Sequence, residues 1–154
     1  MNILSLSLCL NLLAVSVPYH HTITRIACKN NVDPRLVASI IKVESNFKPK
    51  ALLKDPYHGN SMGLMQLKYS TARWMGMKGS PNKLYIPYVN IYYGVHYIKY
   101  LMIRYHGNIG AVISAYNAGS ARWNRQTGYK NKIYVRKVYR NYLNYRRGGI
   151  NVKK

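Results

Sequence analysis

Apolar residues along this chain recur three and four positions apart, in segments separated by loops rich in glycine, proline and asparagine. Such spacing places apolar side chains on one face of a helix, whereas a half-buried strand would show strict alternation. No alternating stretch of useful length occurs. The sequence therefore predicts an all-α fold with little or no sheet. Helices are expected over residues 20–29, 64–74, 89–105, 109–117 and 131–145, besides one that starts at Pro34.

The best-marked helix start lies at Asp33 and Pro34. Aspartate is a favourable N-cap, and proline suits the first helical position because an N–H there would have no acceptor within the helix. Two apolar stripes follow in helical register, Leu36, Ile40 and Val43, and Val37 and Ile41 leading to Glu44. Glu44 is therefore expected on or beside the apolar face, near the C-terminal end of this helix.

Acidic residues are scarce, with three against 24 Lys and Arg. Glu44 is the only glutamate, and Asp33 and Asp55 each precede a proline, as turn and cap residues do. If the chain performs acid–base chemistry with a carboxyl group, Glu44 is the candidate. Asp33 lies eleven residues earlier on the same helix, about 16 Å away, which is too far for a paired carboxylate.

Length and charge limit the class of protein. A chain of 154 residues can form one domain with a substantial core, and a hydrophobic content of 48% argues against disorder. A net charge of +21 exceeds what solubility requires and indicates an anionic partner. Charge alone leaves nucleic acid, an anionic membrane face and an acidic cell-wall polymer open.

The first 17 residues form a mostly apolar run that ends before Pro18. A membrane-spanning helix needs about 20 residues, so the run better suits the apolar region of an export signal. A buried first helix and an uncleaved anchor are the alternatives. We predict a signal peptide or short N-terminal anchor over 1–17, one domain over 18–147 and a basic tail over 148–154.

The two cysteines and five histidines form no metal-ligand pattern. Cys9 lies in the apolar run, so a bridge to Cys28 requires that the mature protein retain this run. No metal and no cofactor are expected.

Three separated segments together carry the functional signal. They are Glu44-Ser45-Asn46-Phe47, Gly63-Leu64-Met65-Gln66 and Ala115-Tyr116-Asn117-Ala118-Gly119. In this order and at these gaps they resemble the soluble (SLT) type of lytic transglycosylase, a family related to goose-type lysozyme. Residues 70–73, 90–101 and 134–139 also resemble segments of that family. The resemblance implies a mainly helical, lysozyme-like domain.

The resemblance also implies an activity: cleavage of the β-1,4 bond between N-acetylmuramic acid and N-acetylglucosamine in peptidoglycan, with a 1,6-anhydro product. Glu44 matches the family's single catalytic acid. The other matching positions are expected to bind substrate: Gln66 and Tyr116 around the reacting sugar, Asn117 directly after that tyrosine, Ser45 beside the acid, Met65 in the cleft wall, and Gly63 where the backbone approaches the sugar.

One carboxyl group is sufficient only if something else stabilises the oxocarbenium-like charge, since ordinary glycoside hydrolysis uses two. The substrate's own N-acetyl group can do so. Glu44 would protonate the leaving oxygen and then deprotonate the muramyl 6-hydroxyl group, which requires a pKa raised by partial burial. A hydrolytic lysozyme that uses Asp55 is an alternative, because Asp55 lies in an inserted loop, residues 54–60, and is the only other carboxylate able to reach the cleft.

The inserted loop is similar to those of transglycosylases associated with secretion systems, pili or phage particles. The expected partners are therefore peptidoglycan glycan strands and components of such an assembly. A monomer is expected, exported to the periplasm or cell wall or carried in a phage virion; nucleic acid is not the favoured partner. The rival hypothesis is a basic protein that binds nucleic acid or membrane on a catalytically inactive lysozyme-like fold, since basic residues interleaved with aromatics suit phosphate contact and stacking.

Overall fold

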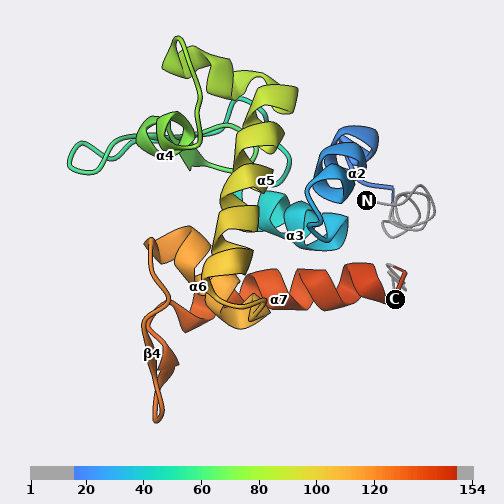
Figure 1. Cartoon of the computed structure of the whole chain (residues 1–154), viewed down its shortest axis with the longest axis vertical. Helices are drawn as coiled ribbons and strands as arrows, with labels where there is room; N and C mark the ends of the chain where they lie inside the picture. Colours follow the sequence, from blue (N-terminus) through green and yellow to red (C-terminus); the bar gives the residue numbers. More distant parts are fainter. Residues whose placement is uncertain (1–15, 149–154) are drawn as a thin grey trace.

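The structure is a computed structural model that describes residues 16–148 (Figure 1). Most of this part of the chain is helical, which confirms the predicted all-α class. The helices are α2 (His20–Lys29), α3 (Pro34–Ser45), α4 (Tyr69–Trp74), α5 (Pro87–Arg104), α6 (Ile109–Ala118) and α7 (Lys132–Arg146), with a 3-10 helix η1 (Pro81–Tyr85). Two small antiparallel sheets accompany them: β1 (Leu52–Leu53), β2 (Ser61–Met62) and β3 (Leu67–Lys68) in one, β4 (Trp123–Asn124) and β5 (Gly128–Tyr129) in the other.

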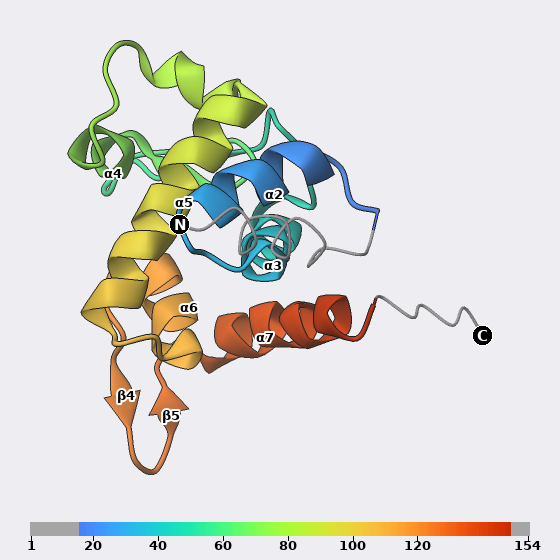
Figure 2. The same ribbon diagram turned by 45° about the vertical axis from the view of Figure 1, so that its right-hand side comes forward.

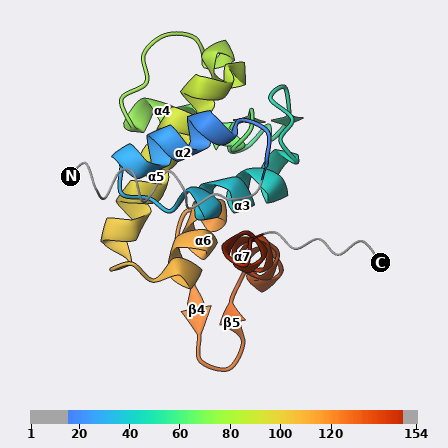
Figure 3. The same ribbon diagram turned by 90° about the vertical axis from the view of Figure 1, so that its right-hand side faces the viewer.

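Helix α3 is the central element of the domain. It lies between α2 and α7, and its most extensive helix contact is with α7 (Figures 1 and 2). The predicted apolar stripes face the core, where Val37, Ile40 and Ile41 are fully buried. Helix α5 contacts α2 and α6, and α6 contacts α7, so the helices close around α3 (Figure 3). This packing places the C-terminal end of α3 against α7.

The start of α3 is as predicted. The Asp33 carboxylate accepts the backbone N–H of Arg35 at 2.8 Å, and Arg35 also pairs with it through its guanidinium group at 2.7 Å. The hydroxyl group of Tyr142, from α7, donates to the same carboxylate at 2.9 Å. Asp33 thus ties α3 to α7 at the end of the helix remote from Glu44, and it has a structural role.

The predicted helix boundaries are confirmed within two residues for all but one helix. The prediction for residues 64–74 is wrong over 64–68, because Gln66 has a positive φ angle of 47° and cannot lie in a right-handed helix. Leu67–Lys68 pairs with Ser61–Met62 instead. The β4–β5 hairpin, which projects from the helical body in Figure 2, was not predicted because two-residue strands show no periodicity.

Several predictions concern residues outside 16–148. They are the leader over 1–17, of which only Ser16 and Val17 are described, and the tail over 148–154, of which only Gly148 is described. The prediction for Cys9 also lies outside the described residues. Cys28 is buried in α2. None of the helices described in residues 16–148 has the length and apolar character that crossing a membrane would require.

Candidate active site

Glu44 lies in the last turn of α3, where that helix meets α7. Its side chain is partly buried. The hydroxyl group of Tyr134, from the first turn of α7, donates a hydrogen bond of 2.5 Å to Oε1 of Glu44. The contact between the two helices therefore fixes the orientation of this carboxyl group.

Burial raises the pKa of Glu44 to about 7, and the hydrogen bond from Tyr134 acts in the opposite direction because it favours the carboxylate. Burial also raises the pKa of Tyr134 and of Tyr116 well above the ordinary tyrosine value, so both remain neutral donors. A carboxyl group with a pKa near 7 can both release and accept a proton near neutral pH. Glu44 thus has the acidity that a combined acid and base requires.

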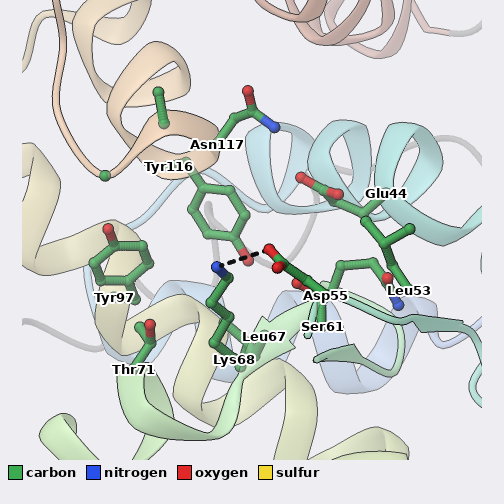
Figure 4. Close-up of a pocket in the computed structure, with 13 residues that line it drawn as sticks. Glu44, Leu53, Asp55, Ser61, Leu67, Lys68, Thr71, Tyr97, Tyr116 and Asn117 are labelled. Atoms are coloured by element: carbon green, nitrogen blue, oxygen red, sulfur yellow. Dashed lines mark ion pairs between the residues drawn. The ribbon is translucent and has the colours of Figure 1, made fainter. Parts of the chain in front are cut away.

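Glu44 faces a cavity of about 410 Å³, which we call the catalytic cavity (Figure 4). Residues from α3, the three-stranded sheet, α4, α5 and the end of α6 form its walls. They are Glu44, Leu53, Asp55, Ser61, Gln66, Leu67, Lys68, Thr71, Tyr97, Tyr116, Asn117, Ala118 and Gly119. The structure therefore brings together Glu44, Gln66, Tyr116 and Asn117, which come from three separate segments of the sequence.

The polar groups of the cavity wall are partly committed to the protein. The side-chain Nε2 of Gln66 donates to the carbonyl groups of Ala51 and Gly63, at 3.1 and 2.9 Å. The amide oxygen of Asn117 accepts from Asn131 at 2.9 Å. These bonds fix both amides and leave the oxygen of Gln66 and the amino group of Asn117 available to a ligand.

The turn that carries Gln66 is anchored to α5 by Asn90. This side chain is fully buried, and it donates to the carbonyl groups of Met62 and Leu84, each at 2.8 Å. Its oxygen accepts the backbone N–H of Met65 at 2.7 Å. Asn90 thus satisfies three backbone groups that the buried turn would otherwise leave unpaired.

The structure does not bring Ser45, Gly63 and Met65, three of the predicted substrate contacts, to the wall of the catalytic cavity. The Ser45 hydroxyl group is buried and donates to the carbonyl of Leu64 at 2.7 Å. Met65 is fully buried, with its carbonyl accepting from the Tyr116 hydroxyl group at 2.8 Å. Ser45 and Met65 therefore form hydrogen bonds that hold the turn over residues 63–66, and Gly63 is part of that turn.

Gly63 approaches protein atoms closely where a sugar was expected. A Cβ atom at this position would lie 2.2 Å from the carbonyl oxygen of Leu84 and 2.3 Å from Nδ2 of Asn90. The glycine therefore allows the turn to pack on η1 and α5.

Asp55 also lines the catalytic cavity (Figure 4). Its carboxylate accepts the backbone N–H groups of Tyr57 and His58, at 3.1 and 2.9 Å, and lies 3.7 Å from Nζ of Lys68. The hydrogen bond from the His58 backbone is the main cause that lowers the pKa of Asp55. Asp55 is therefore ionised at neutral pH, in contrast to Glu44.

The sequence did not predict that Tyr134 would hydrogen-bond to Glu44 or that Asn90 would anchor the turn that carries Gln66. Tyr134 was noted only as the first residue of a family-like segment, because it stands 90 residues from Glu44 and no spacing links the two. Asn90 was noted only as the first residue of such a segment. A polar residue at a core position of α5 was the one available signal that it serves buried backbone groups.

Comparison with known proteins identifies the family. Residues 21–137 match the transglycosylase SLT domain family, so this chain belongs to that family. The resemblance that the three sequence segments indicated is confirmed.

Individual relatives of this chain are also transglycosylases. The chain is 33% identical over 128 residues to a transglycosylase of Enterobacteria phage PRD1, an alignment covering 82% of this chain and 43% of that protein. It is 33% identical over 138 residues to the membrane-bound lytic murein transglycosylase C of Histophilus somni strain 2336, covering 80% of this chain and 37% of that protein. The chain thus spans about two fifths of the length of these relatives.

Solved structures share the fold. An inactive mutant of lytic transglycosylase Slt from Pseudomonas aeruginosa superimposes with a TM-score of 0.73 at 24% identity, covering 83% of this chain and 24% of that one. The 70 kDa soluble lytic transglycosylase of Escherichia coli gives a TM-score of 0.59 at 25% identity, covering 82% and 19%. The lysozyme-like helical architecture is therefore that of the larger enzymes' corresponding domain.

Proposed function

We propose that this protein is a peptidoglycan lytic transglycosylase that cleaves the β-1,4 bond between N-acetylmuramic acid and N-acetylglucosamine, with Glu44 as both acid and base. The observation that carries the proposal is the Glu44 carboxyl group, with its pKa near 7, in a cavity that Gln66, Tyr116 and Asn117 also line. Membership of the transglycosylase SLT domain family supports the same activity.

The chemistry takes two proton transfers. Protonated Glu44 donates to the glycosidic oxygen, the bond from that oxygen to C1 of the muramyl residue breaks, and the N-acetyl group of this residue stabilises the positive charge at C1. The resulting carboxylate then takes the proton of the muramyl 6-hydroxyl group, whose oxygen bonds to C1. Glu44 regains its proton, the 1,6-anhydro ring closes, and no water is consumed.

Tyr134 acts in this proposal as a positioning residue. Replacing it with phenylalanine removes the hydrogen bond that favours the carboxylate, so the pKa of Glu44 should rise further. Activity that needs protonated Glu44 is lost as pH rises through that pKa, so the alkaline limb of kcat/KM should move up by about one pH unit. Tyr139→Phe, on an exposed tyrosine of the same helix, is the control and should leave the profile in place. An unchanged profile in Tyr134→Phe would remove Tyr134 from this role.

The position of Asp55 favours one alternative, hydrolysis. A glycosidase with two carboxyl groups needs a protonated acid and an ionised partner, and the catalytic cavity contains both. We favour the anhydro route because the Asp55 carboxylate is already held by two backbone N–H groups of its own loop and by Lys68.

Product analysis decides between these activities. Purified sacculi are digested in water enriched in heavy oxygen, and the released muropeptides are analysed by mass spectrometry. We expect unlabelled anhydro-muropeptides from the parent and from Asp55→Asn, with kcat/KM of the variant reduced less than about tenfold. Labelled reducing ends that vanish in Asp55→Asn would establish hydrolysis. No product from the parent would favour the basic binding protein on an inactive fold.

The cellular setting is proposed on the same grounds. Peptidoglycan lies outside the cytoplasmic membrane, so we propose that the chain acts after export or from a phage particle. An anionic substrate accounts for the net charge of +21.

A further inference from the structure

A second cavity, of about 510 Å³, adjoins the catalytic cavity at Glu44 and Asn117, which line both. The start of α7 and the residues just before it form its other wall. Three exposed lysines, Lys130, Lys132 and Lys137, line it, and Glu44 is the one carboxyl group among the lining residues. We call it the lysine cavity. It places three cations beside the candidate catalytic group.

These lysines have no acidic partner within residues 16–148. The ion pairs of this part of the chain lie elsewhere, and they are Arg35 with Asp33, and His58 and Lys68 with Asp55. Glu44 accepts a hydrogen bond from Tyr134 and forms no ion pair with the three lysines. Cations gathered in a depression without a counter-charge create a positive potential that attracts an anionic ligand.

Among the described residues, in contrast, the catalytic cavity has no lining cation without a nearby counter-charge. Its one lining cation, Lys68, lies 3.7 Å from the Asp55 carboxylate, so that charge is compensated within the protein. A substrate that spans both cavities therefore meets an uncompensated positive charge only in the lysine cavity. The asymmetry predicts that the anionic part of the substrate lies toward the start of α7.

We propose that the lysine cavity binds free carboxylates of the stem peptide carried by the muramyl residue that reacts at Glu44. The inference rests on the proposed function, because it requires that a muramyl residue occupy the catalytic cavity. The muramyl residue bears its peptide through a lactyl group on C3, so this peptide leaves the sugar close to the reacting bond. Its carboxylates are then the anionic groups nearest to Lys130, Lys132 and Lys137.

The test compares two substrates. Glycan strands carrying stem peptides, and strands freed of them by an amidase and then amidated at the lactyl carboxylates so exposed, are digested by the parent, by the triple variant Lys130→Gln, Lys132→Gln and Lys137→Gln, and by a control with the same charge change. The control variant carries Lys29→Gln, Lys48→Gln and Lys99→Gln, at exposed positions that line neither cavity. Thermal unfolding confirms that all three proteins fold.

We expect the triple variant to raise KM on peptide-bearing strands by about tenfold, since exposed charge pairs are individually weak but three are lost together. On peptide-free strands its KM should stay within about twofold of the parent value, and the control should match the parent on both substrates. Arginine at the three positions should restore the low KM. Equal changes on both substrates, or no change on peptide-bearing strands, would overturn the proposal.

A binding measurement separates this inference from the proposed function. Fluorescent muropeptides with free or amidated carboxylates are titrated with the parent and with the triple variant. The lysine cavity is supported if the parent prefers free carboxylates and the triple variant does not, and it is refuted if the two proteins show the same preference. Absence of anhydro product from the parent would overturn the proposed catalytic function instead, whatever the titration shows.

Discussion

Replacing Glu44 with glutamine is expected to lower the release of anhydro-muropeptides from sacculi by about 10²–10⁴-fold. Glutamine has nearly the same shape, and its amide oxygen can still accept the hydrogen bond from Tyr134. The amide can neither protonate the leaving oxygen nor deprotonate the 6-hydroxyl group, so both proposed proton transfers are lost. Timed digestion with quantification of products by mass spectrometry measures the effect.

Asp55→Asn is the matched control, because it makes the same carboxyl-to-amide change in the same cavity. A much smaller loss is expected for it, since Asp55 takes no part in the proposed proton transfers. Equal losses in the two variants would indicate chemistry that uses both carboxyl groups, and full activity in Glu44→Gln would leave Glu44 without the proposed role.

The same variant has a readout that does not depend on activity. The pKa of Glu44 rises from 4.5 to about 7 on folding, so the folded protein holds this proton more tightly than the unfolded chain. The resulting stability is fully present below pH 4.5 and is lost as pH rises through about 7. Urea unfolding should therefore show the parent losing about 2–3 kcal/mol over this range relative to Glu44→Gln, which cannot ionise. Parallel pH curves for the two proteins would show that Glu44 is not buried as described.

How far the sequence predicted the fold depended on whether local signals and tertiary packing agree. Helix α3 was predicted well because Asp33 and Pro34 mark its start, and because its apolar stripe is the face that the core requires. Residues 64–68 were predicted to be helical because Leu64 and Leu67 continue an apolar pattern. Both side chains are buried, but Leu64 lies in a turn and Leu67 in strand β3. There the hydrogen bonds of Asn90 and the pairing of β3 decide the conformation, and neither shows in local sequence.

The candidate site was predicted in part for a related reason. Glu44 stood out because it is the only glutamate, and the family-like segments identified Gln66, Tyr116 and Asn117, which all line the cavity. A motif does not distinguish residues that face a cavity from residues that support it, so Ser45, Gly63 and Met65 were assigned to the substrate although they hold the turn. Contacts between distant segments, such as Tyr134 with Glu44, depend on how α3 and α7 pack.

Gly63→Ala is expected to destabilise the protein by about 2–5 kcal/mol, because two separate costs add. The backbone at Gly63 has a φ angle of +76°, a conformation that costs a residue with a Cβ atom about 1–2 kcal/mol. The added methyl group would also lie 2.2 Å from the carbonyl oxygen of Leu84 and 2.3 Å from Nδ2 of Asn90. Relieving that overlap must move the turn away from α5 and weaken the hydrogen bonds of Asn90. Urea unfolding of purified protein measures the loss.

Gly107→Ala separates the two costs, because Gly107 has nearly the same φ angle, +75°, and no atom within 4 Å of the position a Cβ would take. This control should lose only the conformational part, about 1–2 kcal/mol. Gly63→Ala should in addition lower kcat/KM at temperatures where it remains folded, since the displaced turn carries Gln66 in the wall of the catalytic cavity. If both variants lose the same stability, the turn does not pack against Asn90 as described, and Asn90 does not support this part of the wall of the catalytic cavity.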